Sequence, residues 1–235
     1  MQSRRAFLQS VSAAGISLAL SAGTASAKVP PMSKEARRAL KPDQALELLM
    51  EGNKRFVTGK TFQRNLMAQV QATASGQYPF AAILGCIDSR VPPELVFDQG
   101  IGDIFSARIA GNFANTDFIG SFEFATKIAG AKLIVVLGHT ECGAIRGACD
   151  LTQMGNLTNV LSNIMPAVYA VTNVQGERNA TNQAFVQEVA LENVRLNVKA
   201  LANRSAILHD LVENGEIKIV GAMYDINTGR VSLIS

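Results

Sequence analysis

The chain of 235 residues contains no tryptophan, only two histidines and only three cysteines. Any thiol or imidazole chemistry must therefore come from a very small set of positions. Three cysteines cannot all be paired in intramolecular disulfides, so at least one thiol is left over. No internal repeat is visible, and the length suits a single domain with a sizeable hydrophobic core.

A long apolar run and a basic stripe are also missing. Residues 11–22 form a mildly apolar stretch, but it is too short and too rich in glycine and serine for a membrane-spanning helix, which needs roughly 20 apolar residues. The formal net charge is only +3. Because the basic residues do not gather in one segment, the sequence does not indicate a nucleic-acid-binding protein.

The N-terminus is typical of an export signal. Arg4-Arg5 is followed by Phe7-Leu8, a small-residue stretch and the cleavage pattern Ala25-Ser26-Ala27. We predict a twin-arginine signal over residues 1–27 and a periplasmic location; a Sec signal or an ordinary amphipathic helix are the alternatives. Removing 27 of 235 residues leaves 208 and takes away two arginines and no acids, so the net charge falls from +3 to +1.

The remaining chain is predicted to be one α/β domain. Residues 28–41 are interpreted as a linker or N-terminal arm, and 42–235 as the single domain that carries the chemistry of the chain. Helices are expected at 42–59, 117–129, 157–172, 182–203 and 205–214, and strands at 80–87, 103–109, 132–137, 216–224 and 230–234. Strands that alternate with helices indicate a mainly parallel β-sheet flanked by helices, with the last two strands forming a C-terminal edge hairpin.

Two short strings carry most of the chemical information: Cys86-Ile87-Asp88-Ser89-Arg90 and His139-Thr140-Glu141-Cys142. Each follows an apolar run that is predicted to be a buried strand. Open α/β sheets bind their ligands at the carboxyl ends of such strands. The two strings are therefore expected to meet in one site.

Two cysteines and one histidine supply three zinc ligands, Cys86, His139 and Cys142. A structural zinc site is normally closed by four protein ligands, whereas a catalytic site keeps one position open for water. A metal site is favoured over a disulfide because His139 lies three residues before Cys142. Cys149 is then a spare or buried thiol, and His209 is expected on the surface of a late helix.

Asp88 and Arg90 have two interpretations. Alone, they would suggest a surface turn with a weak ion pair. Next to a metal ligand, a carboxylate held by a guanidinium stays ionised and fixed in direction, so Asp88 is expected to orient bound water. It is also a possible fourth ligand that closes the site.

The two strings, in the contexts 85–92 and 138–143, closely resemble the β-class carbonic anhydrases, and the likeness extends from Pro42 to Asp225. The resemblance implies reversible hydration of CO2 to bicarbonate by one Zn²⁺ per subunit, bound by the three ligands above, with Asp88 and Arg90 as a catalytic dyad. It also implies a homodimer or homotetramer whose pocket walls come partly from the neighbouring subunit. The implied substrate-pocket residues are Gln77, Phe105, Phe124 and Gly143.

Two departures from the family pattern are visible. Phe124 stands where plant-type members have a tyrosine, so that hydroxyl is missing. Members with an inhibitory bicarbonate pocket carry a tryptophan three residues before the first cysteine, and here that residue is Ile83. The resemblance therefore favours the open, plant-like subtype. Two other functions stay open: a zinc hydrolase of carbonyl sulfide or carbon disulfide on the same scaffold, and a non-catalytic zinc or thiol-sensing protein.

Overall fold

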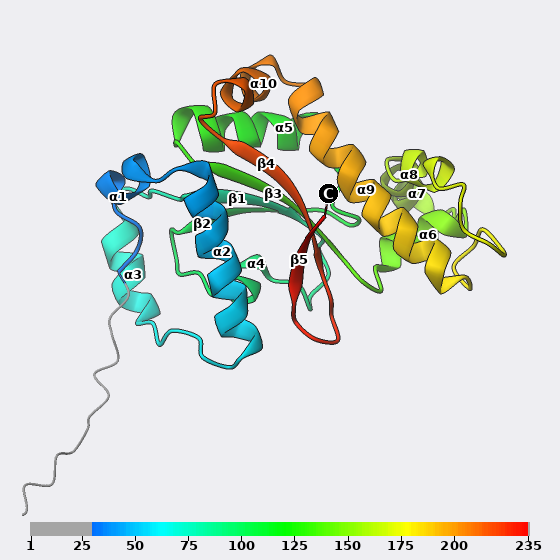
Figure 1. Cartoon of the computed structure of the whole chain (residues 1–235), viewed down its shortest axis with the longest axis horizontal. Helices are drawn as coiled ribbons and strands as arrows, with labels where there is room; N and C mark the ends of the chain where they lie inside the picture. Colours follow the sequence, from blue (N-terminus) through cyan, green and yellow to red (C-terminus); the bar gives the residue numbers. More distant parts are fainter. Residues whose placement is uncertain (1–29, 235) are drawn as a thin grey trace, which may run out of the picture.

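A five-stranded sheet forms the centre of the molecule in a computed structural model that describes residues 30–234 (Figure 1). The predicted export signal, residues 1–27, lies outside the described residues. The strands are β1 (Ala81–Gly85), β2 (Ile104–Arg108), β3 (Leu133–His139), β4 (Lys218–Tyr224) and β5 (Val231–Ile234), in the spatial order β2-β1-β3-β4-β5. The first four strands are parallel, and β5 returns antiparallel to β4. The predicted α/β fold with a C-terminal edge hairpin is confirmed.

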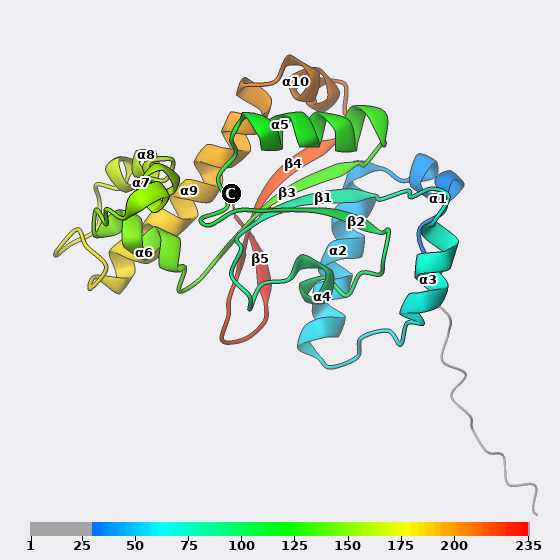
Figure 2. The ribbon, with the colours of Figure 1, turned by 180° about the vertical axis from the view of Figure 1, so that it is seen from behind.

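Helices cover both faces of this sheet. They are α1 (Lys34–Ala39), α2 (Pro42–Val57), α3 (Leu66–Thr73), α4 (Pro93–Val96), α5 (Thr116–Glu123), the π-helix η1 (Phe124–Ile128), α6 (Gly143–Cys149), α7 (Gly155–Ser162), α8 (Met165–Ala170), α9 (Gln183–Asn203) and α10 (Ala206–Glu213). Figure 2 shows α5, α9 and α10 on one side of the sheet, and α2 and α4 on the other. Helices α6, α7 and α8 gather around the beginning of α9 (Figure 1).

Alternating residues of the strands pack into two separate hydrophobic cores, one on each face of the sheet. In β1, Ala82 and Leu84 face the core beneath α9, whereas Ala81 and Ile83 face the core beneath α2. Because successive side chains of a strand point to opposite faces, every interior strand must be apolar throughout, which explains the near-continuous apolar runs in the sequence. Cys86, directly after β1, falls on the α9 side.

Three predicted segments differ from the structure. The expected linker 28–41 contains the short helix α1, capped by the Ser33 side chain. The expected helix 157–172 is two helices, because Pro166 lacks an N–H and is tolerated only in the first turn of a helix, here α8. The expected helix 117–129 is α-helical only to Glu123 and continues as the π-helix η1. Neither α3 nor α4 was predicted.

The parallel register brings the two strings side by side. Gly85, the last residue of β1, is the partner of Leu137 in β3, so Cys86 and His139 emerge at the same edge of the sheet. Both strings lie at the carboxyl ends of their strands, as predicted. Among residues 30–234, no helix combines the length and the apolar character needed to cross a membrane.

Candidate metal centre

Cys86, His139 and Cys142 form the one cluster of potential metal ligands found in the described part of the chain. Their sulfur and nitrogen ligand atoms all lie within 4.8 Å of one another. All three residues are buried, with exposed fractions of 4 %, 1 % and 2 %. Thiolate and imidazole donors at this spacing are the ligands that zinc prefers.

The imidazole of His139 is oriented for metal binding. Its Nδ1 lies 2.8 Å from the carbonyl oxygen of Thr140, which can only accept a hydrogen bond, so Nδ1 carries the proton. Nε2 is then an acceptor, yet it is buried without any hydrogen-bond partner. A buried nitrogen lone pair beside two thiols is costly unless it binds something. The donor set and its orphaned atom therefore fit a zinc ion.

The two thiols of the cluster are reduced and lie close enough to change each other's pKa. None of the three cysteines is in a disulfide. The hydrogen bond from Cys142 lowers the pKa of Cys86, and the same bond, together with burial, raises the pKa of Cys142. The main-chain N–H of Gly111 also donates to Cys86 Sγ over 3.4 Å. Cys149 is buried apart from this cluster, and burial raises its pKa to about 11.

Asp88 and Arg90 form a two-pronged ion pair at the open side of the cluster. Arg90 Nε lies 2.9 Å from Asp88 Oδ1, and its Nη2 lies 2.7 Å from Oδ2. These hydrogen bonds hold the pKa of Asp88 well below its usual range. Asp88 Oδ2 is also 3.9 Å from the orphaned Nε2 of His139. The structure thus places an ionised carboxylate beside the ligands, directed by Arg90.

Two further residues brace this site and were missed by the sequence analysis. Arg108, at the end of β2, donates to the carbonyl oxygens of Cys86 at 2.8 Å and Asp88 at 2.6 Å. Its position near the carboxyl end of the strand predicted at 103–109 was the available signal. Glu141 has a positive φ of 55°, and its carbonyl oxygen accepts a bond from Arg90 Nη2 at 3.4 Å.

The side chain of Glu141 anchors the second string to the helices beyond it. It accepts hydrogen bonds from Arg146 Nη2 at 2.6 Å and from the amide of Gln183. The contact with Arg146 lowers the pKa of Glu141. A non-glycine residue in the left-handed region is held there by its surroundings. This network therefore fixes the turn between the two ligands His139 and Cys142.

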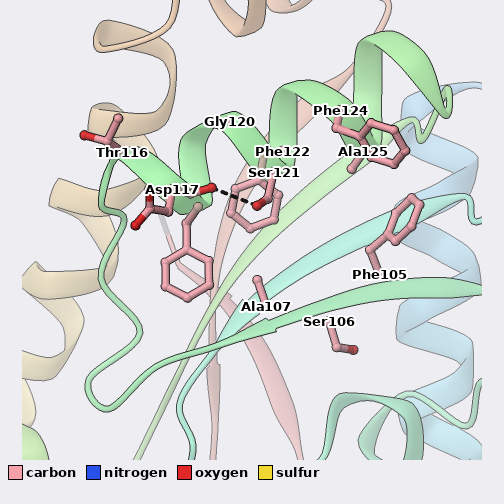
Figure 3. Close-up of a pocket in the computed structure, with 11 residues that line it drawn as sticks. Phe105, Ser106, Ala107, Thr116, Asp117, Gly120, Ser121, Phe122, Phe124 and Ala125 are labelled. Carbon is pink, nitrogen blue, oxygen red and sulfur yellow. Dashed lines mark hydrogen bonds between the residues drawn. The ribbon is translucent and has the colours of Figure 1, made fainter.

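Of the four predicted substrate-pocket residues, only Gly143 lies next to a ligand. Phe105 and Phe124 face each other edge to face, with ring centroids 6.4 Å apart, in a hollow of about 810 Å³ between β2 and the α5–η1 helix (Figure 3). Neither the ligands nor Asp88 lines this hollow. Gly143 is the first residue of α6, directly after Cys142.

Gln77 and Phe105 lie toward the opposite end of the strands from the ligands. Gln77 precedes β1 and is exposed, and Phe105 pairs with Ala82, four residues before Cys86. At about 3.3 Å per residue, that is roughly 13 Å along the strand. One chain therefore does not bring all the predicted pocket residues to its own metal cluster. His209 lies on α10 with an exposed side chain, as predicted.

Comparison with known proteins gives consistent results. A family model described as carbonic anhydrase matches residues 81–231. "Carbonic anhydrase 2" of Mycobacterium tuberculosis is 36 % identical over 198 residues, which is 82 % of this chain and 92 % of that protein. The Coccomyxa β-carbonic anhydrase, solved with acetazolamide, aligns with a TM-score of 0.64 at 23 % identity, over 80 % of this chain and 86 % of that one. A tetrameric β-carbonic anhydrase from Sordaria macrospora aligns with a TM-score of 0.60 at 24 % identity, over 72 % and 90 %.

Proposed function

The chain belongs to the carbonic anhydrase family, and from this premise we propose that it catalyses the reversible hydration of carbon dioxide to bicarbonate and a proton. The observation that carries the proposal is the orphaned Nε2 of His139, which faces two thiols with an ionised carboxylate beside it. Three protein ligands leave a fourth position for water, as catalytic zinc sites do. A purely structural zinc site would need no Asp88–Arg90 pair.

The protein groups around the ligands have separate tasks in this reaction. Zinc, when bound, supplies Lewis acidity that makes a nucleophile of water at neutral pH. Cys86, His139 and Cys142 would hold the zinc, and Asp88 would accept a hydrogen bond from a water at the position that they leave open and so orient it toward the substrate. Arg90 keeps Asp88 ionised and aimed, and Arg108 and Glu141 hold the main chain on either side. Gly143 offers a main-chain N–H to a substrate oxygen.

Stopped-flow measurement of carbon dioxide hydration tests this function directly. The full chain is loaded with zinc, and its rate is compared with that of buffer at pH 8.5 and with that of the metal-free protein. Hydration well above buffer that disappears with the metal is expected. A zinc-loaded protein with no hydration activity would contradict the proposal. Carbon disulfide is assayed in parallel, and hydrolysis of that compound without hydration of carbon dioxide would identify the other zinc hydrolase.

The functional unit is proposed to be at least a homodimer. Phe105, Phe124 and Gln77 match pocket residues of the family, yet they lie away from the ligands of their own chain. The hollow between β2 and η1 is mostly apolar and is lined by Phe124, which is 53 % exposed; Ile128, at the end of η1, is 73 % exposed. A second copy seated there would cover this surface and lend its aromatic side chains to the partner's site.

Export by the twin-arginine route to the periplasm is also proposed. It rests on Arg4-Arg5 and on the cleavage pattern at 25–27. This route carries folded proteins, so zinc can be bound by the thiolates in the reducing cytoplasm before export. Cell fractionation of the full chain tests it: Arg4→Lys combined with Arg5→Lys should leave the protein in the cytoplasm. Equal periplasmic amounts of both forms would contradict the twin-arginine route.

A further inference from the structure

The loop that follows β2 passes directly over the first metal ligand. Gly111, in this loop, donates its main-chain N–H to Cys86 Sγ over 3.4 Å. Gly111 has φ of 81°, a conformation that side chains other than glycine's rarely adopt. Its Cα faces Ile164 so closely that an added Cβ would lie 2.4 Å from the Ile164 Cδ1. The loop is therefore confined on one side by the α7–α8 connection.

Helix α9 confines the same loop from the other side through a buried asparagine. Asn193 is 1 % exposed, and its Nδ2 donates to the carbonyl oxygen of Gly111 over 2.9 Å. Asn197, one turn later, donates to the carbonyl oxygen of Asn193 at 2.7 Å and to its Oδ1 at 3.2 Å. The side chain of Asn193 is thus fixed at both of its polar atoms.

A buried asparagine in the middle of a long helix needs a reason. Asparagine is a weak helix former, and apart from Asn193 and Asn197 the buried residues of α9 are apolar. The hydrogen bond from Asn193 is made to the residue whose N–H contacts the Cys86 sulfur. The two bonds run in series, from α9 through Gly111 to the ligand.

An amide hydrogen bond to a thiolate has a defined effect on a metal site. It fixes the direction of the sulfur lone pairs and withdraws part of the charge that the sulfur gives to the metal. Partners that hold a ligand from behind typically change metal affinity or activity by 10- to 100-fold when they are removed.

We propose that Asn193 is a positioning residue of the metal centre, which holds Gly111 so that its N–H stays on the Cys86 thiolate. The proposal rests on the proposed zinc site. It extends that site beyond the two sequence strings, to a residue more than a hundred positions from Cys86.

Asn193→Ala in the full chain tests this role. Zinc affinity is measured by competition with a chromophoric chelator, and the Co²⁺-substituted protein is examined for its thiolate-to-metal charge-transfer band. The variant should bind zinc roughly 10- to 100-fold more weakly, and its band should shift in wavelength or intensity. If the alanine variant does not fold, Asn193→Ser is measured in the same way, because serine is too short to reach Gly111.

Asn53→Ala is the matched control. Asn53 is also buried, and its Nδ2 also donates to main-chain carbonyls, those of Val96 and Gly229, on the α2 side of the sheet. It should lower the melting temperature to a similar extent but leave zinc affinity and the Co²⁺ spectrum unchanged. An Asn193 variant with wild-type zinc affinity and spectrum would overturn the proposal, and so would equal losses in both variants. A wild-type chain that binds no zinc would instead refute the proposed function.

Discussion

At the scale of single residues, the dyad of Asp88 and Arg90 connects the buried ligands to solvent. The Arg90 side chain is 51 % exposed, that of Asp88 is 16 % exposed, and His139 behind them is fully covered. An ion pair this accessible contributes little to stability. The pair instead sets the direction of the Asp88 carboxylate, because Arg90 donates to both carboxylate oxygens and also to the carbonyl oxygen of Glu141.

Replacing Asp88 separates orientation of water from metal binding. Asp88→Asn keeps the size of the side chain but removes the charge, so kcat should fall by roughly 10- to 100-fold while zinc stays bound. Stopped-flow rates and metal analysis on the same sample check this. Asp210→Asn, an exposed acid paired with His209, is the control and should be neutral. Loss of zinc from the Asp88 variant would show that the carboxylate is a ligand.

Cys149 should make stability depend on alkaline pH. Burial raises its folded-state pKa to about 11, above the ordinary thiol value. Between about pH 9 and 11 the unfolded chain loses this proton and the folded chain keeps it, so the free energy of unfolding falls as pH rises. The stability advantage of wild type over Cys149→Ala should shrink by about 1.5 kcal/mol between pH 7 and pH 10, measured by urea unfolding. A constant difference would contradict this.

At the scale of elements, the strands were predicted well and some helices were not. The interior strands are buried on both faces, so apolar runs identify them. Both motif strings lie at the carboxyl ends of such runs and could therefore be placed as well. Helix α3 was missed because its pattern is inverted: Leu66 and Met67 are exposed, whereas Gln69 is buried. The contacts of Arg108 and Asn193 depend on which elements pack together, and nothing local in the sequence encodes that.

Helices α2 and α4 can pack this closely only because residue 52 is a glycine. A Cβ at Gly52 would lie 1.8 Å from the carbonyl oxygen of Phe97, which belongs to the main chain and cannot move aside cheaply. Gly52→Ala should therefore lower the free energy of unfolding by about 1–3 kcal/mol or more, because the two helices must separate. Glu51→Ala, at the exposed neighbouring position, should stay within about 0.5 kcal/mol. Chemical denaturation of both variants checks the difference, and equal stabilities would contradict it.

At the scale of the whole molecule, the three ligands lie together, whereas Gln77, Phe105 and Phe124 lie away from them. All three zinc ligands come from β3 and from the turns that follow β1 and β3. The aromatic hollow lies on the other half of β2, the open edge of the sheet. The sequence predicted the metal cluster because its residues are adjacent in two strings. It could not place Gln77 or Phe105 in space, since their distance from the ligands depends on strand length and on how β1 and β2 pair.

A charged residue at the proposed interface should separate metal binding from catalysis. Ile128→Asp introduces a carboxylate at an exposed position of η1, and this carboxylate would have to be desolvated on association. The variant should elute with the mass of a single chain and retain zinc, but lose most of its activity. Tyr169→Asp, an exposed position on α8, should retain the wild-type mass and rate. An unchanged assembly in the Ile128 variant would place the interface elsewhere.

The partner that fixes the His139 imidazole is a main-chain atom, the carbonyl oxygen of Thr140. Any substitution at Thr140 other than one that moves the backbone keeps that oxygen in place. Thr140 Oγ1, by contrast, accepts a bond from the N–H of Ile226, and this link to the end of β4 can be lost by mutation. Evolution can therefore vary the side chain next to the ligand without releasing the tautomer. The tautomer of His139 that leaves Nε2 free for a metal is therefore set by the main chain, and a change of the Thr140 side chain does not alter it.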